Sequence, residues 1–139
     1  MNKILAFTAA LLFTFAAYAQ DGVKWEKGTL QEALEKAKNN ENGINRVFLD
    51  CYTSWCGPCK FMSENVFTTK EAGDYFNSRF VNIKIDMEKG EGIDIAKKYN
   101  IKAYPTFLIL DPDGKVVGRV LGGGKLEDFT AKVEKAIKK

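Results

Sequence analysis

Apolar residues spaced three or four positions apart mark several stretches of the chain as amphipathic helices. These stretches are 29–39, 58–66, 68–78, 93–99 and 126–137. Thr29 and Glu32 open the first helix with the pattern of a capping box, which satisfies free backbone N–H groups. Thr68 and Glu71 repeat that pattern at the start of the third. Pro58 suits the first turn of the second helix, so three of the five helices have a predicted start.

Five other stretches have strand character, one before the first helix and four between the helices. They are 23–25, 46–52, 80–86, 103–110 and 115–121. The run 46–52 is apolar and short enough for a buried strand, and 80–86 alternates apolar and polar residues. Asp111-Pro-Asp-Gly114 is a turn sequence, so the last two strands should form a hairpin. The order of elements predicts an α/β fold, a mixed central β-sheet flanked by helices on both faces.

The first nineteen residues differ from the rest of the chain. Lys3 is followed by an uncharged apolar run and then by Ala17-Tyr18-Ala19, the order typical of a secretory signal peptide. The apolar run is shorter than the ~20 residues that cross a bilayer, which argues against the alternative of a membrane anchor. We therefore expect a signal peptide at 1–19, a periplasmic or secreted protein, and one domain at 20–139.

Charge is balanced along the chain. The sequence has 21 Lys and Arg against 18 Asp and Glu, a formal net charge of +3, and the two signs alternate. No basic patch points to nucleic acid or to an anionic membrane surface. Neither class of partner is expected.

Cys51, Cys56 and Cys59 are the only cysteines, and the chain has no histidine. An odd, clustered set does not suit a disulfide scaffold in an exported protein, so the pattern indicates chemistry. A structural zinc site needs four ligands, and this chain offers three Cys and no His, which argues against zinc. Attachment of a c-type haem needs a His after the second Cys, and Lys60 stands there, which excludes that haem. A purely structural 56–59 disulfide is the alternative, although so short a loop removes little entropy from the unfolded chain.

The Cys56-Gly-Pro-Cys59 segment falls at a predicted strand-to-helix junction, and that position favours a reactive thiol. Only the thiolate attacks a disulfide, and free N–H groups at a helix start stabilise negative charge. Cys56 is then the attacking thiol, and Cys59, one turn later, resolves the mixed disulfide. The redox-active disulfide Cys56–Cys59 serves as its own redox group, so no metal and no other cofactor are expected.

Trp55-Cys-Gly-Pro-Cys-Lys60 resembles the thioredoxin active-site sequence at every position, and the resemblance extends along nearly all of 20–139. Asp50 matches the buried acid of that family, and Tyr104-Pro105-Thr106 matches its cis-proline segment. Gly114 and Gly122 match glycines of its closing hairpin and last strand. The resemblance implies a thioredoxin fold with three catalytic residues, which are Cys56, Cys59 and Asp50, the last as base for Cys59.

By the same resemblance, a substrate protein binds beside the cysteine pair. The residues expected to contact it are Trp55, Gly57, Pro58, Tyr104 and Pro105. The 104–105 peptide bond is expected to be cis, and the backbone there could pair with an extended client segment.

The sequence also departs from the family pattern. Tyr52 stands where thioredoxins often have Trp, and Asn82 where a buried Lys often sits, which predicts an altered proton relay around Asp50. The segment 64–71 is instead similar to exported thioredoxin-like domains that accept electrons from membrane redox proteins.

Several of these residues have ordinary alternatives. Asp50 could be a strand-end residue facing water, whereas burial of an unpartnered carboxylate is costly and would imply a function. Cys51 follows Asp50 in the same strand, so its side chain should point to the opposite face of the sheet and act as a packing thiol. A regulatory thiol is the alternative. Trp55 either contacts substrate or packs on its loop. The aromatic residues expected in the core are Phe48, Phe61, Phe67, Phe80 and Phe107.

The function that the resemblance implies is reduction of protein disulfides in the periplasm. Its partners would be disulfide-containing client proteins and a membrane electron donor of thiol-carrier type, and a monomer is expected. Two alternatives stay open. One is a DsbA-like oxidant, which the compartment alone would favour. The other is a non-catalytic thioredoxin-fold binding module or chaperone.

Overall fold

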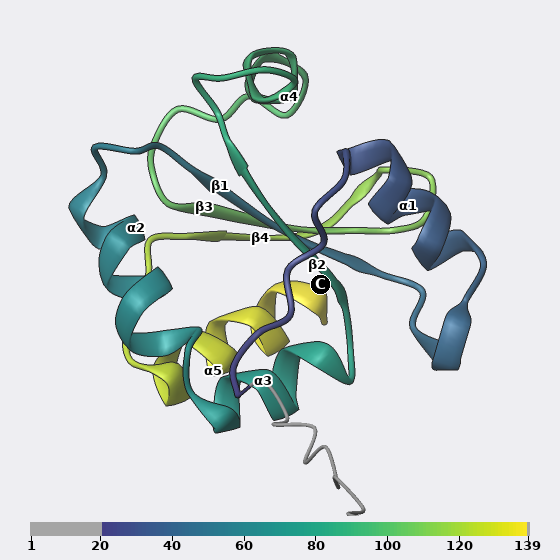
Figure 1. Cartoon of the computed structure of the whole chain (residues 1–139), viewed down its shortest axis with the longest axis horizontal. Helices are drawn as coiled ribbons and strands as arrows, with labels where there is room; N and C mark the ends of the chain where they lie inside the picture. The colour runs from purple at the N-terminus through teal and green to yellow at the C-terminus, as the bar shows by residue number, and fades with distance from the viewer. Residues whose placement is uncertain (1–20, 139) are drawn as a thin grey trace, which may run out of the picture.

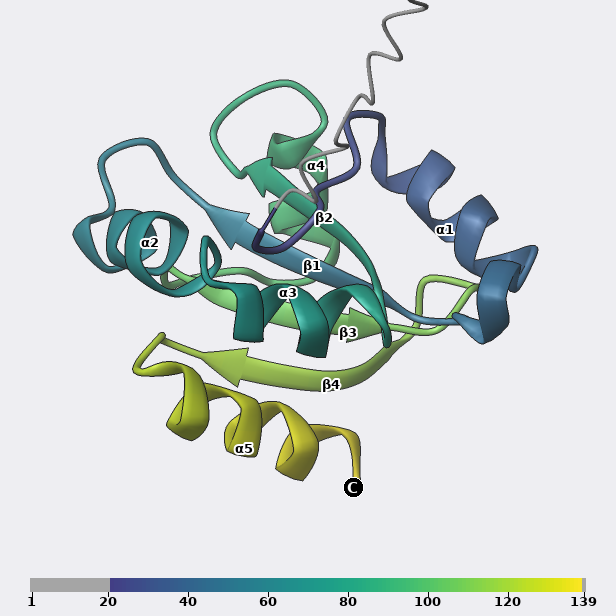
Figure 2. The same ribbon diagram turned by 60° about the horizontal axis from the view of Figure 1, so that its bottom comes forward.

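The computed structural model of the protein describes residues 21–138, and the expected signal peptide lies outside them. A four-stranded sheet in the order β2-β1-β3-β4 carries helices on both faces (Figure 1 and Figure 2). The strands are β1 (Val47–Tyr52), β2 (Val81–Asp86), β3 (Thr106–Leu110) and β4 (Val116–Leu121). The helices are α1 (Leu30–Lys38), α2 (Gly57–Phe61), α3 (Lys70–Asn77), α4 (Gly92–Lys98) and α5 (Leu126–Ile137). A 3-10 turn, η1 (Glu41–Gly43), follows α1, and a π-helical turn, η2 (Met62–Val66), continues α2.

The sheet is mixed, as predicted. β1 runs parallel to β2 and antiparallel to β3, and β3 forms the expected hairpin with β4. The expected first strand is instead a single bridge between Trp25 and Asn82. The N–H of Val23 donates to the Phe67 carbonyl, and the N–H of Glu26 to the sheet edge, both at 2.8 Å. This segment therefore crosses from the helices to β2 and does not run along it.

Alternate residues of β1 face opposite sides of the sheet and separate two cores. Val47, Leu49 and Cys51 belong to the core under α1 and α4. Phe48 belongs to the core under α2, α3 and α5, on the other side of the sheet (Figure 1). Asp50 shares the face of Phe48. The strand therefore directs this carboxyl toward α2, the helix that carries the cysteine pair.

The core under α2, α3 and α5 is largely aromatic. Four of the expected aromatic residues are buried there: Phe48, Phe67, Phe80 and Phe107. Phe48 lies at its centre, with its ring stacked on that of Phe107 at a centroid distance of 5.5 Å. The prediction for Phe61 is wrong, because its side chain is 46% exposed. The buried stripe of this helical segment passes through Met62 and Val66, which turns Phe61 outward.

The helices begin where the local sequence predicts, with one shift. Thr29 caps α1 in the expected capping box. α3 is capped by Thr69, one residue later than predicted, and the Thr69 hydroxyl accepts the N–H of Ala72. The Thr68 hydroxyl instead donates to the Glu64 carbonyl, one turn back, at 2.8 Å. Among residues 21–138, no helix has the length and apolar character needed to span a bilayer.

Candidate active site

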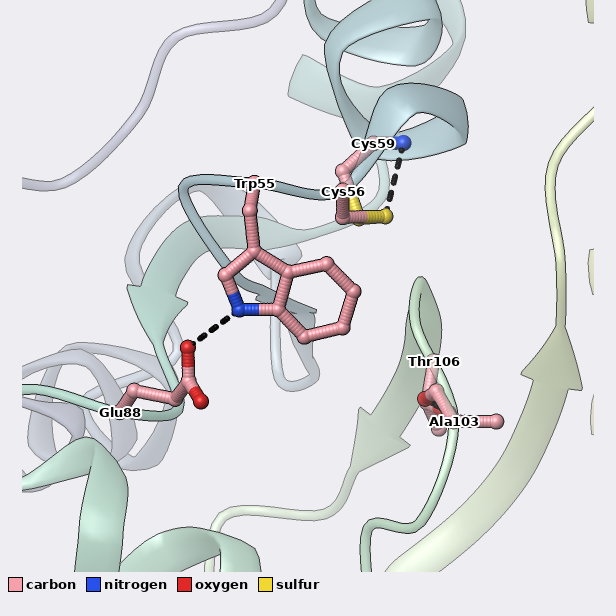
Figure 3. Close-up of a disulfide and its surroundings, with 6 residues drawn as sticks. All are labelled: Trp55, Cys56, Cys59, Glu88, Ala103 and Thr106. Carbon is pink, nitrogen blue, oxygen red and sulfur yellow. Dashed lines mark hydrogen bonds between the residues drawn. A yellow bond between two sulfur atoms is a disulfide. The ribbon is translucent and has the colours of Figure 1, made fainter.

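The cysteine pair lies where β1 leads into α2. Cys56 is the N-cap residue of α2, and it forms a disulfide with Cys59 in which the two Cα atoms are 5.3 Å apart. The N–H of Cys59 donates to Cys56 Sγ at 3.2 Å (Figure 3). Pro58 stands in the first turn, where its missing N–H is not needed. The segment thus holds the Cys56 sulfur at a helix start, where N–H groups favour a thiolate.

Exposure does not distinguish the two sulfur-bearing residues. Cys56 and Cys59 are each 5% exposed in the disulfide form, so burial in this state does not tell the attacking cysteine from the resolving one. Gly57 and Pro58 between them are exposed, and a Cβ at Gly57 would meet no neighbouring atom. A client can therefore approach the disulfide over these two residues, which suits their expected place in the binding surface.

Asp50 is buried in the cavity beneath the cysteine pair. Its side chain is 2% exposed, and its Oδ1 has no hydrogen-bond partner among the described residues. The cavity, of about 150 Å³, is lined by Asp50 together with Cys56, Cys59, Ser63, Lys84 and neighbouring residues. Burial raises the pKa of Asp50 to about 7, against a smaller lowering by the charge of Lys84. The exposed alternative is wrong, and a carboxyl with this pKa can take and return a proton near neutrality.

Lys84, and not residue 82, is the charged neighbour of Asp50. The parallel register sets Lys84 opposite Asp50 and Asn82 opposite Phe48. The Asn82 side chain is buried, and its amide donates to Asn77 Oδ1 at 3.2 Å. The lysine beside Asp50 is therefore Lys84, and the altered proton relay that Asn82 led us to expect stays a prediction. The alternation in β2 puts both residues on one face, but only the register with β1 shows which of them meets Asp50.

Trp55 stands on the surface beside the disulfide. Its side chain is 68% exposed, and its indole N–H donates to a carboxylate oxygen of Glu88 at 2.5 Å (Figure 3). Its ring meets that of Tyr104 edge-on, with centroids 5.9 Å apart. The ring is thus held in place and still open to a client. Nothing in the sequence singles out Glu88, which lies 33 residues away in the turn after β2.

The Tyr104–Pro105 peptide bond is cis, as expected. Two hydrogen bonds fix this segment. In the first, the N–H of Gly122 donates to the Pro105 carbonyl at 2.9 Å. The Thr106 hydroxyl donates to the Ala103 carbonyl at 2.7 Å. β3 begins at Thr106, later than predicted, because proline has no N–H for a strand ladder. This backbone is therefore held between β3 and the end of β4, and the Tyr104 ring reaches that of Trp55.

Cys51 is a packing residue. Its side chain is fully buried in the core on the opposite face of the sheet from the cysteine pair. Burial raises the pKa of its thiol, and the negative charge of Asp50 raises that pKa further. A thiol that stays protonated and inaccessible does not react with partners, so the structure does not support the regulatory alternative.

The redox group of the site is built from protein alone. Within 21–138, no three His, Cys, Asp or Glu side chains gather closely enough to hold a metal ion. The disulfide Cys56–Cys59 can itself take up two electrons and two protons as it opens to a dithiol.

Comparison with known proteins supplies the family. The family model described as a thioredoxin-like domain matches residues 30–137. Mitochondrial thioredoxin-3 of Saccharomyces cerevisiae is 36% identical over 89 residues, which are 64% of this chain and 65% of that protein. Chloroplastic thioredoxin F of Oryza sativa is 40% identical over 92 residues, 66% of this chain and 46% of that protein. The chain thus spans less than two thirds of the length of these relatives.

Solved structures are similar over more of the chain. A protein of Bacteroides thetaiotaomicron, described as a candidate disulphide-isomerase, is 42% identical with a TM-score of 0.74 and covers 85% of this chain and 95% of its own. The DsbH oxidoreductase is 20% identical with a TM-score of 0.72, and the match covers 94% of this chain and 95% of that protein. At this identity the likeness shows the fold alone. The match at 30–137 and the Cys56–Cys59 pair at the helix start agree with these likenesses. This chain has the thioredoxin fold and belongs to the thioredoxin family of thiol–disulfide oxidoreductases.

Proposed function

We propose that this protein reduces the disulfides of exported proteins in the periplasm through a Cys56/Cys59 dithiol. The observation that carries the proposal is the buried, unpartnered carboxyl of Asp50 in the cavity under the cysteine pair. The export features of residues 1–19 support the compartment.

The first chemical step belongs to Cys56. Its thiolate, held near the N–H of Cys59, attacks one sulfur of the client disulfide. A bond forms between Cys56 Sγ and that sulfur, the client S–S bond breaks, and the leaving client sulfur takes up a proton from water.

The second step belongs to Cys59 and Asp50. The Cys59 thiol gives its proton to the Asp50 carboxylate, directly or through water in the cavity, and the resulting thiolate attacks Cys56 Sγ. The Cys56–Cys59 disulfide forms, the mixed disulfide breaks, and the second client sulfur leaves and is protonated. Two electrons have then passed from the cysteine pair to the client.

The surroundings of Cys56 favour a pair that donates electrons. A strongly oxidising pair has a reduced form stabilised by extra positive charge near its thiolate. Here Lys60, in the same helix, lies 3.9 Å from the Glu64 carboxylate, and the chain has no histidine. Asp50, when ionised, adds negative charge below the pair. Beyond the helix N–H groups, the cations near the pair have carboxylate neighbours, Lys60 in Glu64 and Lys84 in Asp50. The thiolate thus gains little extra support, which leaves the disulfide form favoured and makes the dithiol the better reductant.

A protein that reduces disulfides in an oxidising compartment must itself be reduced again. A membrane electron donor of thiol-carrier type would supply the two electrons, by attack of its thiolate on the Cys56–Cys59 disulfide. A relative, thioredoxin f2, 33% identical with a TM-score of 0.58, has been solved in complex with ferredoxin:thioredoxin reductase. The exposed ring of Trp55 beside the pair offers client and donor the same docking place.

The reduction potential of the Cys56–Cys59 couple tests the direction of the reaction. Equilibration with glutathione is expected to give a value near the about −270 mV of thioredoxin. A value near the about −120 mV of DsbA would make the protein an oxidant. If the protein does not catalyse the reduction of insulin disulfides by dithiothreitol, the alternative of a non-catalytic binding module is favoured.

Export is tested separately by intact mass. The periplasmic protein is expected to begin at Gln20, after cleavage at the small-residue site. A chain that keeps Met1 and fractionates with membranes would contradict the proposed compartment.

A further inference from the structure

Lys84 lies beside Asp50 without pairing with it. The two residues are opposite each other in the parallel register of β1 and β2, so their side chains leave the same face of the sheet. The Lys84 ammonium nevertheless donates to Ser63 Oγ at 3.0 Å. It also lies 5.0 Å from the centre of the Tyr52 ring. No ion pair joins Lys84 to Asp50, whose Oδ1 stays without a partner in the described chain.

Ser63 reaches Lys84 from the π-helical turn η2. In this turn the N–H of Phe67 donates to the carbonyl of Met62, five residues back, at 2.9 Å. Met62 and Val66 point into the core, while Ser63 is half-buried and lines the cavity that Asp50 also lines. Turns of this kind are rare and often lie at functional sites. The hydroxyl that binds Lys84 therefore comes from the helix layer, and it competes with Asp50 in the sheet for the same ammonium.

Charged and titratable side chains face Asp50 from three directions. They are Tyr52 from β1, Lys84 from β2, and Cys56, Cys59, Lys60 and Glu64 from α2 and η2. The residue opposite Asp50 on β3 is Phe107, which carries no charge. Lys60 and Glu64 lie 3.9 Å apart and largely offset each other. The Lys84 ammonium is therefore the charge whose position adjusts how strongly Asp50 holds a proton, beside the larger effect of burial.

We propose that Ser63 is a positioning residue, which holds the Lys84 ammonium away from Asp50 and so keeps that carboxyl able to exchange a proton with Cys59. Without the hydroxyl, the Lys84 ammonium has to turn to another oxygen of the cavity, and we expect it to pair with the carboxyl of Asp50, which lies opposite it in the sheet. A paired carboxylate holds its negative charge more firmly and is a weaker base. The consequence for catalysis rests on the proposed role of Asp50, but the placement of Lys84 does not.

The direct test is the titration of Asp50 in Ser63→Ala, followed by carboxyl carbon NMR in the mature protein. Pairing with Lys84 should lower the pKa of Asp50 by about one unit, a tenfold loss of proton affinity. Ser54→Ala is the matched control, because Ser54 lines the same cavity without bonding to Lys84. Ser63→Thr keeps the hydroxyl and should restore the wild-type titration. An unchanged or raised pKa of Asp50 in Ser63→Ala would overturn the proposal.

A double replacement separates a charge effect from a packing effect. Lys84→Met should raise the pKa of Asp50, and adding Ser63→Ala to it should change nothing more, because the hydroxyl acts through the ammonium. A further drop in the double variant would show that Ser63 acts on Asp50 by another route, against the proposal.

The effect on catalysis is measured as the rate at which Cys59 resolves a mixed disulfide. In Ser63→Ala the pH at which this rate reaches half its maximum should fall with the pKa of Asp50, and the maximum should fall severalfold. If Asp50→Asn leaves the rate unchanged while Ser63→Ala still shifts the titration, the role of Asp50 fails and the placement of Lys84 stands. If Asp50→Asn slows the step but Ser63→Ala shifts neither readout, the present proposal alone fails.

Discussion

Replacement of Asp50 by Asn removes a carboxyl whose charged form the fold disfavours. Burial raises the pKa of Asp50 from 3.8 to about 7. Between these pH values the unfolded chain has lost the proton that the folded protein still holds. The free energy of unfolding of the wild type therefore falls as the pH rises from about 4 to about 7. Above and below that window, the contribution of Asp50 to this free energy does not change with pH. At about 1.4 kcal/mol per pKa unit, the fall amounts to about 4 kcal/mol.

The amide that Asp50→Asn introduces cannot ionise. The free energy of unfolding of this variant should therefore not show the fall that Asp50 causes in the wild type. The free energy of unfolding, from urea denaturation of the oxidised proteins between about pH 4 and pH 8, measures the difference. Asp50→Asn should gain on the wild type through the window and keep a gain of about 4 kcal/mol above it. Asp113→Asn, at an exposed carboxylate in the hairpin turn, is the matched control and should show no comparable gain. A difference that does not depend on pH would refute the reasoning.

The same variant has a kinetic consequence. Asp50→Asn should slow the release of a client from the mixed disulfide by about 10²-fold or more, the usual scale for a lost general base. The first attack should change much less, because the Cys56 thiolate is supported by the N–H of Cys59. Single-turnover kinetics separate the two steps. Equal slowing of both would show that Asp50 acts on the site as a whole.

Three further replacements test the site and the core. Cys59→Ser should accumulate covalent mixed disulfides with clients on non-reducing gels, and Cys56→Ser should trap none; trapping by both would contradict their assigned order. Trp55→Ala should raise KM for a protein disulfide severalfold while changing the free energy of unfolding by less than about 1 kcal/mol, since its ring is mostly exposed and touches Tyr104 at one edge. Phe48→Ala should cost about 3–5 kcal/mol in urea denaturation because its ring is enclosed; a loss below about 1 kcal/mol would mean that the core repacks.

Local sequence patterns determined much of the fold and the chemistry of the site. The capping box at Thr29, the turn before the last strand and the spacing of apolar residues in α5 depend on contacts within a few residues, so they can be predicted without the tertiary fold. The Cys56–Cys59 pair is equally local, because the spacing of the two residues brings them together over one helical turn. Asp50 required the family resemblance, and its burial agrees with it.

The tertiary structure decided the features that depend on which segments meet. Pairing of β1 with β2 selected Lys84 over Asn82 as the neighbour of Asp50, because a strand pattern determines the face but not the register. The direction of the helical segment after Cys59 turned Phe61 outward and brought Ser63 to Lys84. These outcomes follow from the packing of layers that lie far apart in the sequence, and no spacing within one segment contains that information.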